Sequence, residues 1–197
     1  MEVYHLSHFL AYLSRMKLIK RWGLMRNIYP ENIQEHSLQV AIIAHSLALI
    51  KNKFYHGKVN PERIAILAMY HEVSEIITGD LASPIKYFNP QIKKAFGEIE
   101  DFARERLFNM VPDELKSEYK QLIFYEETDN ESLKLIKIAD KLSAYIKCLE
   151  ELTAGNKEFI EAEKALKMEL ERFKCPELDY FIDNFLPSFN LTLDEMN

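Results

Sequence analysis

The sequence predicts an all-α protein of seven or eight helices. Apolar residues recur at the three- and four-residue spacing of a helix along nearly the whole chain, and the strict alternation that marks a half-buried strand is absent. Glycine and proline are few, 5 and 7 in 197 residues, which favours long helices over a fold rich in turns. A chain of this length fits one domain with its own core, and we expect residues 1–197 to form it.

The first two predicted helices are separated by an irregular stretch. Residues 5–19 and residues 36–51 carry apolar side chains near helical spacing. Residues 20–35 lose this spacing and contain Arg21 next to the only tryptophan, Trp22. Because arginine can hold a phosphate through two parallel hydrogen bonds, Arg21 is a candidate phosphate clamp, although exposed Arg–Trp pairs are also common on protein surfaces.

The later helices are marked by their first and last residues. Asn60-Pro61 and Asn89-Pro90 each place asparagine at an N-cap and proline at the first helical position. Gly155 is expected to end a long helix, since glycine is common just past a helix end. Residues 81–88 are expected to form a loop. The helices expected after residue 60 cover residues 61–78, 90–110, 111–125, 128–154, 157–173 and 177–186.

The composition argues against several classes of function. A formal net charge of −6 leaves no basic surplus for a nucleic-acid polymer or an anionic membrane surface. The N-terminus lacks the pattern of a signal peptide, and no apolar run reaches the ~18 residues that a membrane helix needs. The two cysteines, Cys148 and Cys175, lack the spacing of a zinc or redox motif and are expected to be free thiols. We therefore expect a cytoplasmic protein that binds neither nucleic acid nor membrane.

The densest group of reactive side chains lies between Tyr70 and Asp80. It contains His71, Glu72 and Glu75, and the apolar run before it indicates a buried helix. If one helix continues through this stretch, His71 and Glu75 lie about 40° apart and Glu72 lies about 100° from His71. A buried helix face with this many ionisable groups is costly unless a cation compensates them. The stretch therefore predicts a metal site on one arc of one helix.

Two further residues are candidates to complete this site. His36 stands at the start of an apolar helix, where it would be either a metal ligand or an ordinary buried histidine. Asp140 lies among apolar neighbours on another helix, where it would either bind a cation or pair with a lysine such as Lys137. Two imidazoles and two carboxylates suit Mn²⁺, Co²⁺, Fe²⁺, Ni²⁺ or Zn²⁺ better than Mg²⁺ or Ca²⁺. Glu75, one turn from His71, would then take or give a proton.

Four segments of the chain resemble one known family. Residues 21–27, with the pattern Arg-Trp-x-Leu-Met-Arg-Asn, are followed in the same order by residues 35–41, 68–81 and 139–152. These segments resemble the bacterial 5′-deoxynucleotidases of the YfbR type, which are HD-domain metal phosphohydrolases. The resemblance extends over essentially the whole chain.

The resemblance implies a single HD-domain helical bundle that hydrolyses 2′-deoxyribonucleoside 5′-monophosphates with one divalent transition metal, such as Co²⁺ or Mn²⁺. It also implies a homodimer. By motif position, the implied metal ligands are His36, His71, Glu72 and Asp140. The implied catalytic residues are Glu75, as acid or base, and Arg21, which would orient the phosphate. The implied substrate-binding residues are Arg21, Trp22, His36, Glu72, Asp80, Leu81, Ala82, Ser83 and Asp140. Among them, Trp22 would pack against the deoxyribose where a 2′-hydroxyl would otherwise lie.

The chain departs from the family at one of these positions. The family has aspartate where this chain has Glu72. The extra methylene adds roughly 1.5 Å of reach, whereas metal–ligand distances hold within about 0.2 Å. Two alternatives therefore stay open. One is an HD-fold nucleotide-binding protein with weakened or lost catalysis, and the other is an HD phosphohydrolase with a different nucleotide substrate.

Overall fold

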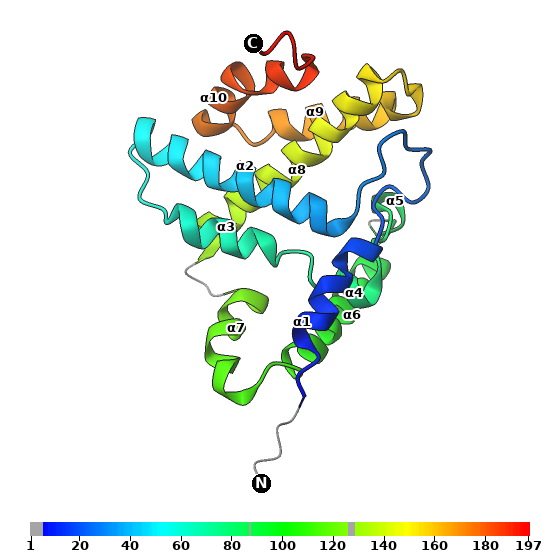
Figure 1. Ribbon diagram of the computed structural model, residues 1–197, viewed down its shortest axis with the longest axis vertical. Helices are drawn as coiled ribbons and strands as arrows, with labels where there is room; N and C mark the ends of the chain where they lie inside the picture. The colour runs from blue at the N-terminus through cyan, green and yellow to red at the C-terminus, as the bar shows by residue number, and fades with distance from the viewer. Residues whose placement is uncertain (1–5, 87, 126–128) are drawn as a thin grey trace. The chain divides into compact units, whose positions relative to one another are not determined.

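Helices form nearly all the regular structure in the part of the chain that the computed structural model describes, residues 6–86, 88–125 and 129–197 (Figure 1). The other regular feature there is an isolated bridge that pairs Lys20 with Asn32. The all-α prediction is confirmed. The α-helices are α1 (Phe9–Leu13), α2 (Ile33–Phe54), α3 (Pro61–Met69), α4 (Glu75–Thr78), α5 (Ser83–Lys86), α6 (Pro90–Phe108), α7 (Lys116–Ile123), α8 (Asn130–Thr153), α9 (Ile160–Glu171) and α10 (Pro176–Asn184). The 3-10 helices are η1 (Ser14–Leu18), η2 (Asp113–Leu115), η4 (Lys157–Phe159) and η5 (Leu186–Asn190).

Helices with clear cap residues agree best with the prediction. The Asn89 side chain accepts a hydrogen bond from the Ile92 N–H at 2.8 Å and starts α6 where predicted. The Asn60 side chain accepts from the Arg63 N–H at 2.9 Å and does the same for α3. Gly155, with φ of 88°, follows the end of α8. The start predicted for α8 at residue 128 lies outside the described residues.

Two predictions about the extent of helices and loops are wrong. The helix predicted over residues 5–19 is short: α1 has five residues and continues as the 3-10 helix η1, while the first residue of the prediction lies outside the described part. The loop predicted over residues 81–88 contains the single turn α5. Short turns of this kind explain why the described residues contain ten α-helices where seven or eight were predicted.

The predicted continuous helix over residues 61–78 is also wrong, because residues 70–74 form a turn between α3 and α4. Val73 and Leu67 are both buried. On one straight helix these side chains would point about 120° apart, so one helix face would not bury both. Hydrogen bonds in the turn span three residues rather than four, as between the Val73 N–H and the Tyr70 carbonyl (3.2 Å). Packing therefore overrides the helical periodicity here.

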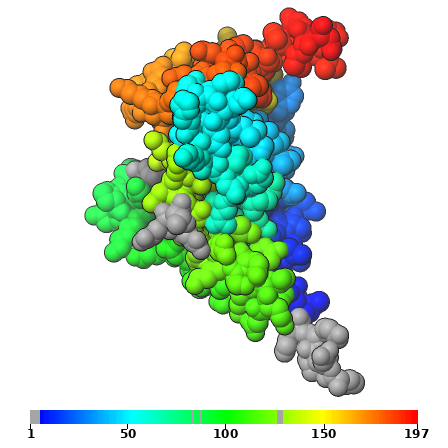
Figure 2. All heavy atoms as spheres, turned by 90° about the vertical axis from the view of Figure 1, so that its left-hand side faces the viewer, coloured from blue at the N-terminus to red at the C-terminus, as the bar shows by residue number. Residues whose placement is uncertain are grey.

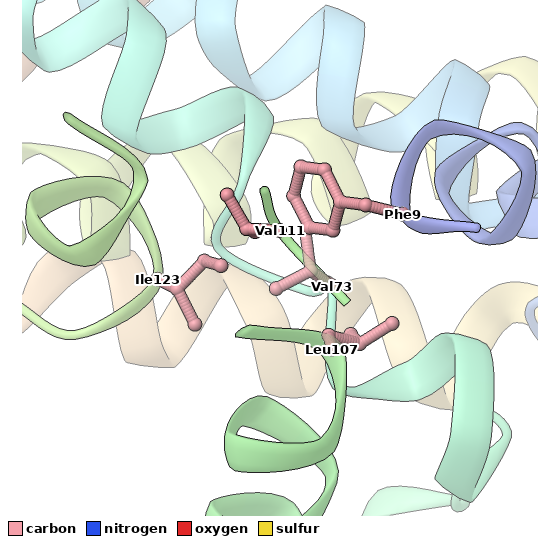
Figure 3. Packing of buried hydrophobic residues seen from close by; sticks show 5 residues of the cluster. All are labelled: Phe9, Val73, Leu107, Val111 and Ile123. Atoms are coloured by element: carbon pink, nitrogen blue, oxygen red, sulfur yellow. The ribbon is translucent and has the colours of Figure 1, made fainter. Parts of the chain in front are cut away.

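The chain divides into two compact units. The first consists of the described parts of residues 1–24, 30–37 and 70–127. Its core joins α1, the turn at residues 70–74, α6 and α7 (Figure 3), and its buried centre is Phe9, Val73, Leu107, Val111 and Ile123. Because Val73 lies in this core, the neighbouring side chains of the turn are held on a packed element.

The second unit consists of the described parts of residues 25–29, 38–69 and 128–197, with α8 at its centre. Along α8 most side chains from Leu135 to Cys148 are buried, and α3, α9 and η5 pack on this helix (Figure 1). Figure 2 shows α10, in orange and red, against the end of α2, in cyan. The Phe54 and Tyr180 rings stack there with centroids 4.9 Å apart.

A buried charged network joins residues 25–29 to the end of α8 within the second unit. The Glu151 carboxylate is fully buried and accepts hydrogen bonds from the N–H groups of Ile28 and Tyr29, both at 2.9 Å. Lys147 and Asn156 donate to the same carboxylate. Burial alone would raise the pKa of Glu151, but these four hydrogen bonds outweigh it and lower the pKa to about 2.

Both cysteines, Cys148 and Cys175, are buried free thiols, as predicted. Across the described residues, no helix combines the length and apolarity needed to cross a bilayer. The single domain over residues 1–197 stays a prediction.

Candidate metal centre

A short antiparallel pairing organises the irregular stretch after η1. The bridge between Lys20 and Asn32 places Arg21 beside Glu31, and the Arg21 N–H donates to the Glu31 carbonyl oxygen at 3.0 Å. The Arg21 Nε also donates to Glu31 Oε2 at 3.0 Å. The main chain and the side chain of Glu31 therefore both hold Arg21.

Trp22 has an unusual backbone conformation. Its φ is 57°, in the left-handed region that costs a bulky residue on the order of 1–2 kcal/mol. Its indole N–H donates to Glu31 Oε2 at 3.0 Å. Its backbone N–H donates to the Asp80 carboxylate. Contacts from two other segments of the first unit therefore hold Trp22 in this conformation.

His36 lies in the first turn of α2. That turn begins with a capping box: the Asn32 side chain accepts from the N–H groups of Gln34 and Glu35, both at 3.0 Å, and the Glu35 carboxylate accepts from the Asn32 N–H at 3.2 Å. The box fixes where the helix starts. The His36 side chain is fully buried.

His36, His71 and Glu72 come together within the first unit. The two imidazole rings have centroids 5.5 Å apart. Glu72 Oε1 lies 3.7 Å from His36 Nε2 and 3.8 Å from His71 Nε2. One ligand atom from each of the three residues lies within 4.8 Å of the others. The sequence placed His71 and Glu72 on a helix arc; the structure instead places them in the turn at residues 70–74, and the turn brings them to His36.

This donor set fits a divalent transition metal. Ligands bound about 2.1 Å from one ion at tetrahedral angles lie roughly 3.4 Å apart, close to the distances from Glu72 Oε1 to the two imidazole nitrogens. Two imidazoles with a carboxylate suit ions of borderline softness. The surroundings are also rich in acidic groups, because Glu31, Glu75 and Asp80 lie near the same cluster. A cation would offset this negative charge.

Arg21 contacts the cluster through Glu72. Its Nη1 donates to both carboxylate oxygens of Glu72, at 3.1 Å and 3.2 Å. Arg21 thus lies between two carboxylates, Glu31 and Glu72, and its side chain is 12% exposed. Arg21, the predicted phosphate clamp, therefore lies in the site and binds the carboxylate of one candidate metal ligand, Glu72.

Glu75 begins α4 and is buried, with 7% of the residue exposed. Within the described residues, its Oε2 atom has no hydrogen-bond partner. Burial, followed by the negative charges of Glu72 and Asp80, raises the pKa of Glu75 to about 9, and the positive charge of Arg21 offsets only part of this effect. Without a bound metal ion, Glu75 therefore holds a proton at neutral pH, the state that a general acid needs.

The stretch after α4 brings Asp80 to the same site. Gly79 has φ of 73° and ψ of 165°, a conformation open essentially to glycine alone, and it redirects the chain after the helix. Burial raises the pKa of Asp80, while Arg21 and the Trp22 N–H oppose the shift. Leu81 and Ala82 follow half-buried, and the backbone of Ser83 opens α5.

One predicted metal ligand belongs to the second unit, and one residue of the site was not predicted. Asp140 is half-buried on α8 in the second unit, and its assignment as a metal ligand stays a prediction. Sequence reasoning missed Glu31, whose carboxylate contacts Arg21 and Trp22. The only signal was an acidic residue in the irregular stretch beside Arg21 and Trp22, which is too common a pattern to single out.

Comparisons with known proteins give a consistent family. A family model described as 5′-deoxynucleotidase YfbR-like matches residues 8–189. The 5′-deoxynucleotidase YfbR of Escherichia coli strain E2348/69 is 54% identical over 191 residues, which cover 97% of this chain and 96% of that protein. A 5′-deoxynucleotidase of Vibrio vulnificus is 52% identical over 191 residues, with 97% and 98% covered.

Solved structures give the same fold. An HD-domain phosphohydrolase from Listeria innocua has a TM-score of 0.78 at 23% identity, with 92% of this chain and 88% of that chain covered. The cyanophage S-2L HD phosphohydrolase DatZ, solved with dA and one catalytic Zn²⁺ ion, has a TM-score of 0.64 at 19% identity, with 90% and 96% covered. These likenesses show an HD-domain fold.

Proposed function

Because this chain belongs to the 5′-deoxynucleotidase YfbR-like family, we propose that its buried cluster of two histidines and a glutamate is the centre that hydrolyses 2′-deoxyribonucleoside 5′-monophosphates. The chain is a 5′-deoxynucleotidase and thus a phosphoric monoester hydrolase. The observation that carries the proposed centre is the approach of Glu72 Oε1 to both imidazoles, at 3.7 Å and 3.8 Å.

The proposed metal ligands are His36, His71, Glu72 and Asp140. The approach of Glu72 to the two imidazoles supports the first three, and the position of Asp140 in the family pattern supports the fourth. Co²⁺ or Mn²⁺ is the proposed ion. When bound, such an ion would polarise a phosphoryl oxygen and lower the pKa of a bound water.

Glu75 is the proposed catalytic acid and base. In the hydrolysis a water oxygen bonds to phosphorus, the bond from phosphorus to O5′ breaks, and O5′ takes a proton. Glu75, whose pKa is raised first of all by burial, would give that proton and regain one from the attacking water.

Arg21 is proposed to orient the phosphate. A phosphate oxygen would compete with the Glu72 carboxylate for Arg21 Nη1. Glu31 holds Arg21 Nε through a separate contact, so the guanidinium would keep its orientation during this exchange.

A further set of residues is proposed to bind the substrate. Trp22 would pack against the deoxyribose, and its link to Asp80 supports placing both at the nucleoside side. The complete proposed set is Arg21, Trp22, His36, Glu72, Asp80, Leu81, Ala82, Ser83 and Asp140. A homodimer and a cytoplasmic location, without binding to nucleic-acid polymers or membranes, also stay predictions.

A hydrolysis assay tests this function. Metal-stripped protein, given Mn²⁺ or Co²⁺ and dAMP, should release phosphate, and EDTA should stop the release. Glu75→Ala should lower the rate by about 10²-fold or more, because the leaving O5′ would lose its proton donor. Stoichiometric binding of dAMP without any phosphate release would instead favour the nucleotide-binding alternative. Equal hydrolysis of dAMP and AMP would favour a different nucleotide substrate.

A further inference from the structure

The Glu31 carboxylate joins two proposed substrate-binding residues at one atom. Glu31 Oε2 accepts a hydrogen bond from Arg21 Nε and another from the Trp22 indole N–H, both at 3.0 Å. The Glu31 side chain is only 11% exposed, so solvent screens these contacts weakly. One oxygen atom thus fixes the guanidinium and the indole relative to each other.

The strained backbone conformation of Trp22 requires contacts such as the one with Glu31 to hold it. With φ of 57°, the backbone of Trp22 is in a region that bulky residues rarely adopt unless their surroundings hold them there. Asp80 holds its backbone N–H, and Glu31 holds its ring. Without the Glu31 carboxylate, the ring would lose the contact that selects its orientation.

The second carboxylate oxygen of Glu31 faces the metal cluster. Glu31 Oε1 lies 4.0 Å from His36 Nδ1, which is too long for a hydrogen bond but places a negative charge beside the imidazole. The other ring nitrogen of His36, Nε2, faces Glu72. A carboxylate behind a metal-binding histidine commonly orients the ring. Glu31 therefore contacts the residues proposed for the phosphate and the sugar and places a charge beside a proposed metal ligand.

We infer that Glu31 is a positioning residue that sets the discrimination between deoxyribonucleotides and ribonucleotides. It does so by holding the Trp22 ring against the place of the sugar C2′ and by fixing Arg21 at the phosphate. The inference rests on the proposed function, in which Trp22 packs against the deoxyribose. It adds a residue with no assigned role to that site.

Two variants and a matched control test the inference. Glu31→Ala removes both contacts, whereas Glu31→Gln keeps a neutral oxygen that can accept from the indole. Glu35→Gln is the control, because Glu35 is an exposed carboxylate four residues away that caps the Asn32 N–H, and glutamine also serves in a capping box. For each protein, kcat/KM is measured with dAMP and with AMP.

The wild-type ratio of kcat/KM for dAMP to that for AMP should fall about tenfold or more in Glu31→Ala. Part of this fall should be a rise in kcat/KM for AMP, because the displaced ring would no longer occupy the place of the 2′-hydroxyl. The ratio for Glu31→Gln should lie between the ratios for Glu31→Ala and the wild type. The ratio for Glu35→Gln should equal that of the wild type. If Glu31→Ala or Glu31→Gln keeps the wild-type ratio, the inference is overturned. If Glu31→Ala does not fold, the ratio for Glu31→Gln alone tests the inference.

A second readout does not depend on turnover. Trp22 is the only tryptophan, so tryptophan fluorescence, excited at wavelengths that the ten tyrosines do not absorb, reports on this ring alone. Acrylamide should quench it more strongly in Glu31→Ala than in the wild type or in Glu35→Gln. If the wild type releases no phosphate from any deoxynucleotide, the proposed function fails. Unchanged quenching in Glu31→Ala would instead show that Glu31 does not hold the ring, and the inference would fail separately.

Discussion

Arg21 Nη1 donates to both carboxylate oxygens of Glu72, at 3.1 Å and 3.2 Å, in a contact that a shorter aspartate would be about 1.5 Å from making. The resemblance implies aspartate at this position, so the glutamate adds an interaction between the proposed phosphate clamp and a proposed metal ligand. On the proposed ligand set, a metal ion and Arg21 would therefore compete for the same carboxylate.

Replacing Glu72 by aspartate should remove this competition. We expect Glu72→Asp to bind Mn²⁺ about tenfold more tightly than the wild type. We also expect this variant to have a higher kcat/KM for dAMP. Titration of the metal-stripped protein with Mn²⁺, followed by phosphate release, measures both quantities. Weaker Mn²⁺ binding in Glu72→Asp would show that the longer side chain suits this cluster better.

The raised pKa of Glu75 predicts a pH-dependent stability. A carboxyl group with a pKa of about 9 in the folded protein, against an ordinary 4.5, stabilises the fold fully below pH 4.5 and loses this effect as the pH rises toward 9. Glutamine resembles the protonated group. Glu75→Gln should therefore stabilise the metal-stripped protein at pH 8.5, on the order of 2 kcal/mol, and flatten the fall in stability between pH 5 and 9.

Urea unfolding in EDTA across this pH range measures the effect of Glu75→Gln. Glu105→Gln, an exposed glutamate in α6, is the matched control and should follow the wild-type curve. Parallel curves for Glu75→Gln and the wild type would contradict the burial of a protonated Glu75.

Two glycines of the first unit should respond to alanine with opposite signs. Gly79 has φ of 73° and ψ of 165°, so Gly79→Ala should cost about 2 kcal/mol from backbone strain, although no atom lies within 4 Å of the new Cβ. Gly97 lies inside α6 with open space around the Cβ position, so Gly97→Ala should stabilise the protein by about 0.5–1 kcal/mol. Thermal melts of both variants test the pair, and equal shifts would rule out the strain at Gly79.

The backbone conformation of Trp22 allows a substitution that removes the ring without adding strain. Asparagine tolerates the left-handed region better than other non-glycine residues. Trp22→Asn should therefore stay folded, with a melting temperature near that of the wild type, and lose most of the discrimination between dAMP and AMP. Trp22→Phe keeps a ring in the same place and should retain more of it. If Trp22→Asn still discriminates as the wild type does, the proposed contact with the sugar is wrong.

The sequence predicts those parts of the fold that local chemistry decides. Asn89 starts α6 because its side chain reaches the Ile92 N–H, a contact that depends only on neighbouring residues. The break at residues 70–74 contains neither glycine nor proline. It arises because Val73 joins a core with Phe9 and Leu107, residues distant in sequence. Periodicity within one segment carries no information about such packing.

In the candidate site, too, local residue type is predictable from the sequence and contacts between distant segments are not. His36, His71 and Glu72 were selected by residue type and motif, and the structure brings all three together. Glu31 was missed because its role depends on the pairing of Lys20 with Asn32, two residues with no strand pattern around them. Positioning residues of this kind become visible only when distant segments are placed side by side.

The Glu151 network has a consequence for the amide protons of the segment that it holds. Ile28 and Tyr29 lie in irregular structure and expose about half of their surface, at 48% and 56% of each residue, so they resemble residues of a mobile loop. Their N–H groups nevertheless donate to a carboxylate that is fully buried and stays ionised down to a pH of about 2. Hydrogen exchange at these two amides should therefore be as slow as in the interior of α8, which would make a surface loop one of the last parts of the second unit to open.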